Sequence, residues 1–263
     1  MHYILSLVFV LITLASPTVS FAKDFEILRM SDIVEHIDAD TLVIFDLDNT
    51  LIQPKQMLGS NQWYDFIVGR FLAGGLELNV AIDAALKDWN AVQLKTEVLA
   101  VENTTPKIIA AIQAKGNKIL GLTARPMDLA AASKAQLQSV GIDLSLTPVS
   151  KKDFWLDKPR ELLFSSGVLF VGAKSNKGEE LVVLLKKLDL KPKRIVFVDD
   201  KVSHIKNVGN SVSKTPIEYL GFRYAAADEY VAAFSGKIAD IQHFRFRFDG
   251  KLLADNEIKE LGE

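Results

Sequence analysis

Short apolar runs that end in polar side chains are the feature that most constrains the fold of this chain. The first run, LVIF at residues 42–45, leads directly into Asp46 and Asp48, and three later runs also end in polar residues. Between the runs lie longer segments with the apolar spacing of helices. Short buried strands that alternate with helices are typical of a parallel α/β sheet, in which helices connect and cover the strands.

The individual elements can be placed from these patterns. Strands are expected at residues 41–45, 118–122, 168–171, 194–198 and 217–224. In TTPKIIAAIQAKG, Thr105 is placed to cap a helix, Pro106 to occupy its first position and Gly116 to end it. Two further helices are expected at about residues 127–140 and 178–188. Each of these helices leads into the next strand of the expected sheet.

Residues 55–103 interrupt this alternation. They contain two helical patterns, at 62–72 and 78–101, with no strand pattern between them. We expect a small helical cap, inserted after the first strand into a core made of residues 23–54 and 104–263. Near the C-terminus, a helical pattern from residue 225 leads into HFRFRFDG, which alternates aromatic and basic residues. This segment is expected to pack on the core, because a nucleic-acid surface needs a wider basic area.

The first residues differ in kind from the rest. Residues 1–22 carry no charged side chain, have an apolar run up to about residue 15, and end with Ser20 and Ala22 as small residues before Lys23. This pattern predicts a secretory signal peptide, and an uncleaved N-terminal anchor is the alternative. No later segment approaches the length of an uncharged membrane span. The mature protein is therefore expected to be soluble and periplasmic or secreted.

Composition narrows the partners and the source of stability. The 263 residues include no cysteine, so the core has to stabilise the protein without disulfides. The formal net charge of −2, from 31 basic and 33 acidic residues, favours neither nucleic acid nor an anionic membrane as a partner.

Asp46 and Asp48 are the first candidate functional residues. Because ligands bind at the carboxyl ends of the strands in an open parallel sheet, both carboxylates are expected at a ligand site. Two carboxylates this close repel each other unless a cation, a proton or a hydrogen-bond donor intervenes. A hard divalent ion such as Mg²⁺ would hold them. For this pair alone, turn and helix-cap aspartates remain the simpler interpretation.

Three further groups of polar residues follow later strands. Thr123 ends the second strand and is placed to hold a phosphate oxygen. Lys174 and Lys177 lie between the third strand and a helix, where either could reach an anion. Asp199 and Asp200 end the fourth strand. Each group alone could be a helix cap, a solvated charge or a turn.

Together, and in this order, DLDNT, the strand that ends in Thr123, SNKGEEL and VFVDD resemble the four motifs of the haloacid dehalogenase (HAD) superfamily over residues 41–224. The resemblance implies a Rossmann-like core and a phosphatase that uses an aspartate nucleophile. It implies that Asp46 attacks phosphorus and that Asp48 acts as the general acid and base. Thr123 and Lys177 would stabilise the transferring oxygens, and Lys177 is preferred to Lys174 because it directly precedes the helix that begins with GEE.

The same resemblance implies a cofactor and further contacts. Mg²⁺ would be bound by Asp46, the backbone carbonyl of Asp48, Asp199 and Asp200. Arg125 and Asn49 are candidate substrate contacts, although a surface salt bridge is an equal alternative for Arg125 and the motif assigns no definite role to Asn49. Thr50 is expected to stabilise the loop.

The function expected from this resemblance is a Mg²⁺-dependent phosphomonoesterase that acts through an aspartyl-phosphate on a phosphorylated small molecule. Three alternatives remain open: a secreted phosphatase with a macromolecular substrate, a binding protein without turnover, and a phosphotransferase or mutase that uses the same intermediate. LDNTL, LGSNQW and SNKGEEL also resemble an uncharacterised secreted branch of the superfamily in Gram-negative bacteria. That narrower resemblance supplies no substrate, and the sequence indicates no oligomeric state.

Overall fold

An eight-stranded sheet forms the centre of the protein. The computed structural model describes residues 22–156 and 161–260, so the expected signal peptide lies outside the described residues except for Ala22. In spatial order the strands are β1 (Ala22–Ile27), β10 (Glu218–Tyr224), β9 (Arg194–Asp199), β2 (Thr41–Phe45), β5 (Ile119–Thr123), β8 (Val168–Phe170), β7 (Leu162–Ser165) and β6 (Phe154–Leu156). In this spatial order, all neighbouring strands from β1 through β10, β9, β2 and β5 to β8 pair in parallel. At the edge, β7 pairs antiparallel with β8, and β6 pairs antiparallel with β7. The predicted parallel α/β sheet is confirmed.

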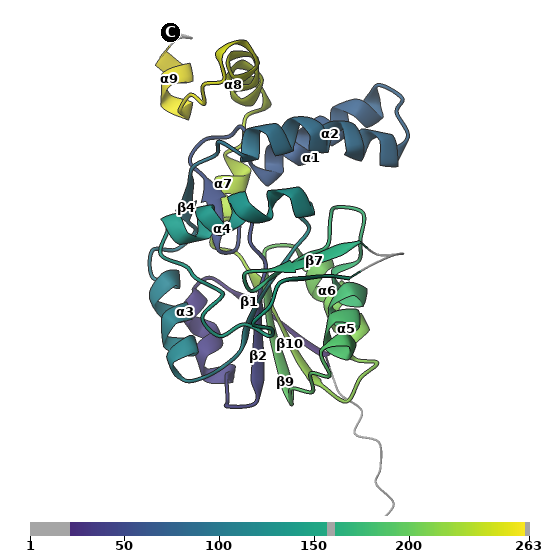
Figure 1. The fold of residues 1–263 in the computed structure, drawn as a ribbon. Coiled ribbons are helices and arrows are strands. Elements are labelled where there is room, and N and C mark those ends of the chain that lie inside the picture. The colour runs from purple at the N-terminus through teal and green to yellow at the C-terminus, as the bar shows by residue number, and fades with distance from the viewer. Residues whose placement is uncertain (1–21, 157–160, 261–263) are drawn as a thin grey trace, which may run out of the picture.

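Helices cover both faces of the sheet (Figure 1). One face packs on η1 (Met30–His36), α3 (Thr105–Ala114), η2 (Met127–Leu129) and α4 (Ala130–Ser139), and the other packs on α5 (Lys177–Lys187) and α6 (Val202–Val212). Along β2, Val43 and Phe45 contribute to the first core, whereas Leu42 and Ile44 contribute to the second. Because neighbouring strand residues face opposite sides, this uninterrupted apolar run fills two cores at once. The arrangement is Rossmann-like.

Several elements differ from those expected. β1, β6 and β7 were missed, because their sequences are polar or short, and β1 is an exposed edge strand that pairs with β10. The helix α3 begins one residue earlier than predicted, with Thr104 at the cap position and no side-chain capping bond there. Its predicted end is right, since Gly116 adopts a φ of 88°, which favours glycine.

Two antiparallel segments connect the helical cap to the core. The cap consists of α1 (Asn61–Ala73) and α2 (Leu78–Gln93), and Ser60 caps α1 by accepting a 3.0 Å hydrogen bond from the backbone of Trp63. The prediction that the second helix continues to residue 101 is wrong. Instead, β4 (Val98–Ala100) pairs with β3 (Ile52–Pro54), so the entrance and exit of the cap satisfy each other's backbone groups.

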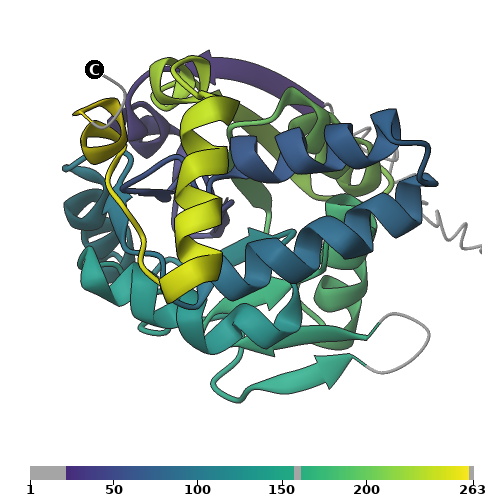
Figure 2. The same cartoon turned by 90° about the horizontal axis from the view of Figure 1, so that it is seen from above.

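The C-terminal segment packs on the cap. After α7 (Asp228–Ala232), α8 (Gly236–Asp249) crosses α1 and α2, and α9 (Asp255–Glu260) follows (Figure 2). Gln242 of α8 is fully buried and accepts a 2.9 Å hydrogen bond from the backbone of Leu58. HFRFRFDG therefore ends a helix, and Phe246 packs on the hydrophobic cluster of the cap instead of on the sheet. No helix among the described residues is long and apolar enough to span a membrane.

Candidate functional site

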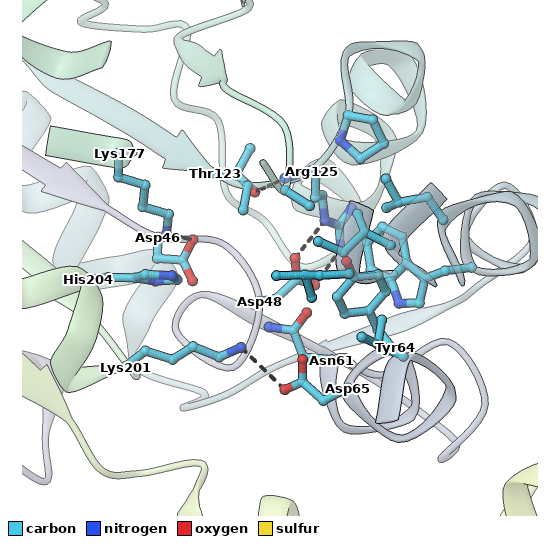
Figure 3. Close-up of a pocket in the computed structure, with 18 residues that line it drawn as sticks. Asp46, Asp48, Asn61, Tyr64, Asp65, Thr123, Arg125, Lys177, Lys201 and His204 are labelled. Atoms are coloured by element: carbon cyan, nitrogen blue, oxygen red, sulfur yellow. Dashed lines mark hydrogen bonds and ion pairs between the residues drawn. The ribbon is translucent and has the colours of Figure 1, made fainter. Parts of the chain in front are cut away.

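The polar residues that follow the central strands converge beneath the cap. Asp46 directly follows β2, Thr123 is the last residue of β5, and Asp199 is the last residue of β9. Because β2 lies between β5 and β9 in the sheet, their carboxyl ends bring these side chains to one place. Figure 3 shows Asp46 and Thr123 at this edge. All three residues are buried.

Lys177 lies between two of these carboxylates. Its Nζ donates to Oδ1 of Asp46 at 2.6 Å and to Oδ2 of Asp199 at 2.8 Å, and all three side chains are buried. Burial acts to lower the pKa of Lys177, but the two aspartates outweigh it and raise the pKa, so the ammonium stays charged. Lys174 instead forms a 2.6 Å ion pair with Asp83 of the cap. The structure places Lys177, not Lys174, at the site.

The pKa values of Asp46 and Asp199 shift in opposite directions. Burial acts to raise the pKa of Asp199, but Lys177 and His204 outweigh it and lower the pKa to about 2. For Asp46, burial outweighs the attraction of Lys177 and raises the pKa to about 6.

His204 was not predicted from the sequence. Its Nδ1 lies 3.0 Å from both carboxylate oxygens of Asp199. The feature that could have indicated His204 in the sequence is its position on the first turn of α6, which follows Asp199.

Three carboxylates could hold a divalent cation. Oxygens of Asp46, Asp199 and Asp200 lie within 4.8 Å of one another. Burial, together with repulsion from Asp199 and Asp46, raises the pKa of Asp200 to about 8, and its buried Oδ1 has no hydrogen-bond partner among the described residues. Hard oxygen donors with one unpartnered buried atom fit Mg²⁺, because a divalent ion would remove both the repulsion and the unsatisfied acceptor.

Arg125 binds Asp48. Its Nε and Nη2 donate to the two carboxylate oxygens of Asp48 at 2.8 and 2.7 Å, and Nη1 donates to Ser133 at 2.9 Å and to Gln136 at 2.6 Å. The guanidinium also lies 5.6 Å from the ring centroid of Trp89 in the cap. Arg125 is 2% exposed, so the alternative of a surface salt bridge is wrong. The guanidinium orients Asp48, and Arg125 also lines the cavity described below.

The loop after Asp48 contacts Asp200, one of the three clustered carboxylates. Asn49, which adopts a φ of 58°, donates from its amide to Oδ2 of Asp200 at 3.3 Å. Thr50 accepts a 3.1 Å hydrogen bond from the backbone of Asp200, so it stabilises the loop as expected. Asn49 is buried and is not among the residues that line the cavity.

A cavity of about 270 Å³ separates the strand ends from the cap. Asp46, Asp48, Thr123 and Lys177 form its floor, with Lys201 and His204 at one side (Figure 3). The helices α1 and α2 form its roof. Titratable groups with shifted pKa values in a concave pocket are typical of an active site.

Comparison with known proteins identifies relatives without an assigned activity. Residues 26–259 match a family described as a protein of unknown function (DUF2608). A protein of Chlamydia pneumoniae named "Putative outer membrane protein" is 26% identical over 232 residues, which cover 84% of this chain and 83% of the relative. A protein of Chlamydia trachomatis with the same name is 24% identical over 242 residues, which cover 90% and 91%. An uncharacterized protein of Rickettsia prowazekii is 24% identical over 240 residues, which cover 87% and 85%. No solved structure matches this chain.

Proposed function

Because the chain belongs to the DUF2608 family, whose description assigns no function, we propose one from the site: a Mg²⁺-dependent phosphomonoesterase of the HAD type. It acts through an aspartyl-phosphate on a phosphorylated small molecule. The order of the four motif positions and their convergence at the strand ends support this proposal. One observation carries it. Asp46, a buried aspartate that directly follows β2, is held by Lys177 and belongs to an acidic cluster that fits a divalent cation.

The chemistry divides into two displacements at phosphorus. In the first, a carboxylate oxygen of Asp46 bonds to phosphorus, and the bond from phosphorus to the ester oxygen breaks with its electron pair on that oxygen. Asp48 gives its proton to this leaving oxygen, which departs as the alcohol. In the second, water attacks the phosphorus of the aspartyl-phosphate while Asp48 takes a proton from it. Inorganic phosphate leaves, and Asp46 is regenerated.

The surrounding residues have supporting roles. The ammonium of Lys177 and the hydroxyl of Thr123 lie where they can stabilise charge on the phosphoryl oxygens. Arg125 orients Asp48, and one of its two bonds has to give way when Asp48 approaches the ester oxygen. Mg²⁺, when bound to Asp46, Asp199 and Asp200, would neutralise charge on the phosphate and the carboxylates.

We also propose that the protein acts outside the cytoplasm, in the periplasm or after secretion. The sequence pattern of residues 1–22 supports this location. So does the name of the chlamydial relatives, "Putative outer membrane protein".

The proposal is tested by measuring phosphate release from small phosphate esters by the purified protein, with and without Mg²⁺. We expect release to depend on Mg²⁺ and to fall by about 10³-fold or more in Asp46→Asn. The matched control is Asp40→Asn, which changes an aspartate at the opposite end of β2 that pairs with Lys193. If wild type and Asp46→Asn release phosphate at the same rate, the nucleophile is wrong. If the folded wild type releases none from any ester, the proposed activity is wrong.

A further inference from the structure

The roof of the cavity carries an apolar stripe. Leu78, Ile82 and Leu86 lie four residues apart on α2, so they share one side of the helix, and all three line the cavity. Among the described residues, none of the three belongs to the hydrophobic clusters of the sheet or of the cap. The core-facing side of α2 is formed instead by residues such as Ala81 and Ala85, which are fully buried.

α2 offers the cavity no free polar group. Its fourth lining residue is Trp89, whose Nε1 already donates to the backbone oxygen of Ser60 at 3.2 Å. A hydroxyl of a sugar or a polar edge of a nucleobase placed against this wall would lose water without gaining a hydrogen-bond partner. The wall therefore disfavours polar alcohols.

The neighbouring helix α1 extends this wall and also brings polar side chains to the cavity. Tyr64 and Val68, again four residues apart, line the cavity, and the ring of Tyr64 meets Trp89 edge to face at 6.2 Å between centroids. The charged residue that α1 adds, Asp65, is paired with Lys201 across the cavity at 3.4 Å. The charged groups thus gather at the floor and one side, and Asn61 adds a polar side chain at the start of α1, while the wall formed by α2 stays apolar.

We propose that the substrate is a phosphate ester of a hydrophobic alcohol, whose hydrocarbon portion lies along Leu78, Ile82 and Leu86 while its phosphate lies at Asp46. This inference rests on the proposed function, because it assigns the alcohol of the same reaction. From Leu78 to Leu86 the stripe runs for about 12 Å along the helix. Leu78 is 56% exposed, so the stripe ends at solvent, and a chain longer than the cavity can extend outward.

The test is a series of linear alkyl phosphates, from methyl to octyl, with glycerol phosphate as the polar comparison. All are used below the concentrations at which they form micelles. We expect kcat/KM to rise by up to about fourfold for each methylene that the stripe covers, and glycerol phosphate to be a poorer substrate than propyl phosphate. Ile82→Gln and Leu86→Gln should flatten this dependence on chain length. Val80→Gln should retain it, because Val80 is on the opposite side of α2 and is 52% exposed.

A second readout separates this inference from the proposed function. Binding of alkylphosphonates, which cannot be hydrolysed, is measured by calorimetry on Asp46→Asn in Mg²⁺. Phosphate release without any dependence on chain length overturns the hydrophobic alcohol and leaves the phosphatase standing. If no ester is hydrolysed, the phosphatase fails. In that case, an affinity that rises with chain length and falls in Ile82→Gln still supports an apolar ligand. An affinity that does not depend on chain length overturns the apolar ligand as well.

Discussion

Replacing Lys177 with methionine should destabilise the protein strongly. The ammonium lies 2.6 Å from one buried carboxylate and 2.8 Å from another, and the lysine side chain is 2% exposed. Methionine has nearly the same length, so the change removes charge and leaves little empty volume. What remains is a pair of aspartates, Asp46 and Asp199, that are buried together without their shared cation.

The expected cost follows from this burial. Removing one partner of a buried ion pair costs about 3–5 kcal/mol, chiefly because the other partner stays buried and uncompensated. For a chain of this size, that corresponds to a fall in Tm on the order of 10 °C. Lys174 provides the matched control, because it is also a lysine paired with an aspartate, but the two side chains are 42% and 65% exposed. Lys174→Met should cost at most about 1 kcal/mol.

The free energy of unfolding of wild type, Lys177→Met and Lys174→Met is measured by urea denaturation in EDTA and again in Mg²⁺. Mg²⁺ should recover part of the loss in Lys177→Met, because a bound cation would compensate the same two aspartates. If Lys177→Met costs no more than Lys174→Met in EDTA, the reasoning from buried charge is refuted.

Three further changes test the packing and the charges around this site. Arg125→Met should lower the free energy of unfolding in urea by about 3–5 kcal/mol, and adding Asp48→Asn should restore part of this loss. Strictly additive losses in the double variant would contradict the coupling between Arg125 and Asp48. Gly178→Ala should destabilise by about 1–3 kcal/mol, because its Cβ would lie 2.3 Å from a backbone oxygen of α6, whereas Gly69→Ala, with open space around it, should gain about 0.5–1 kcal/mol. Burial acts to raise the pKa of Glu102, but hydrogen bonds from backbone and hydroxyl groups outweigh it and lower the pKa below 4.5. Its contribution to stability is therefore present above pH 4.5 and lost as the pH falls through the lowered pKa, so Glu102→Gln should flatten the acid dependence of Tm, and an unchanged profile would count against this origin.

Elements whose signal lies in neighbouring residues could be predicted from the amino-acid sequence. The apolar run at residues 42–45 predicts a strand buried on both faces, and β2 lies at Thr41–Phe45 as expected. Because parallel strands all present their carboxyl ends at one edge, strand placement alone predicts that Asp46 and Asp199 meet. The end of α3 at Gly116 was likewise predictable, since a left-handed backbone there requires only local chemistry.

Tertiary structure decided which side chains contact each other across long stretches of sequence. Arg125 and Asp48 are 77 residues apart, and no local pattern distinguishes a guanidinium that binds substrate from one that binds a carboxylate. Which of Lys174 and Lys177 reaches the site also depended on packing, because Asp83 on α2 of the cap forms an ion pair with Lys174. The polar strand β1 forms because β10 offers it an edge, and α8 contacts the cap because α1 and α2 expose an apolar surface there. Patterns along the chain determine how each segment folds, but burial and charge pairing between distant segments determine where each one packs.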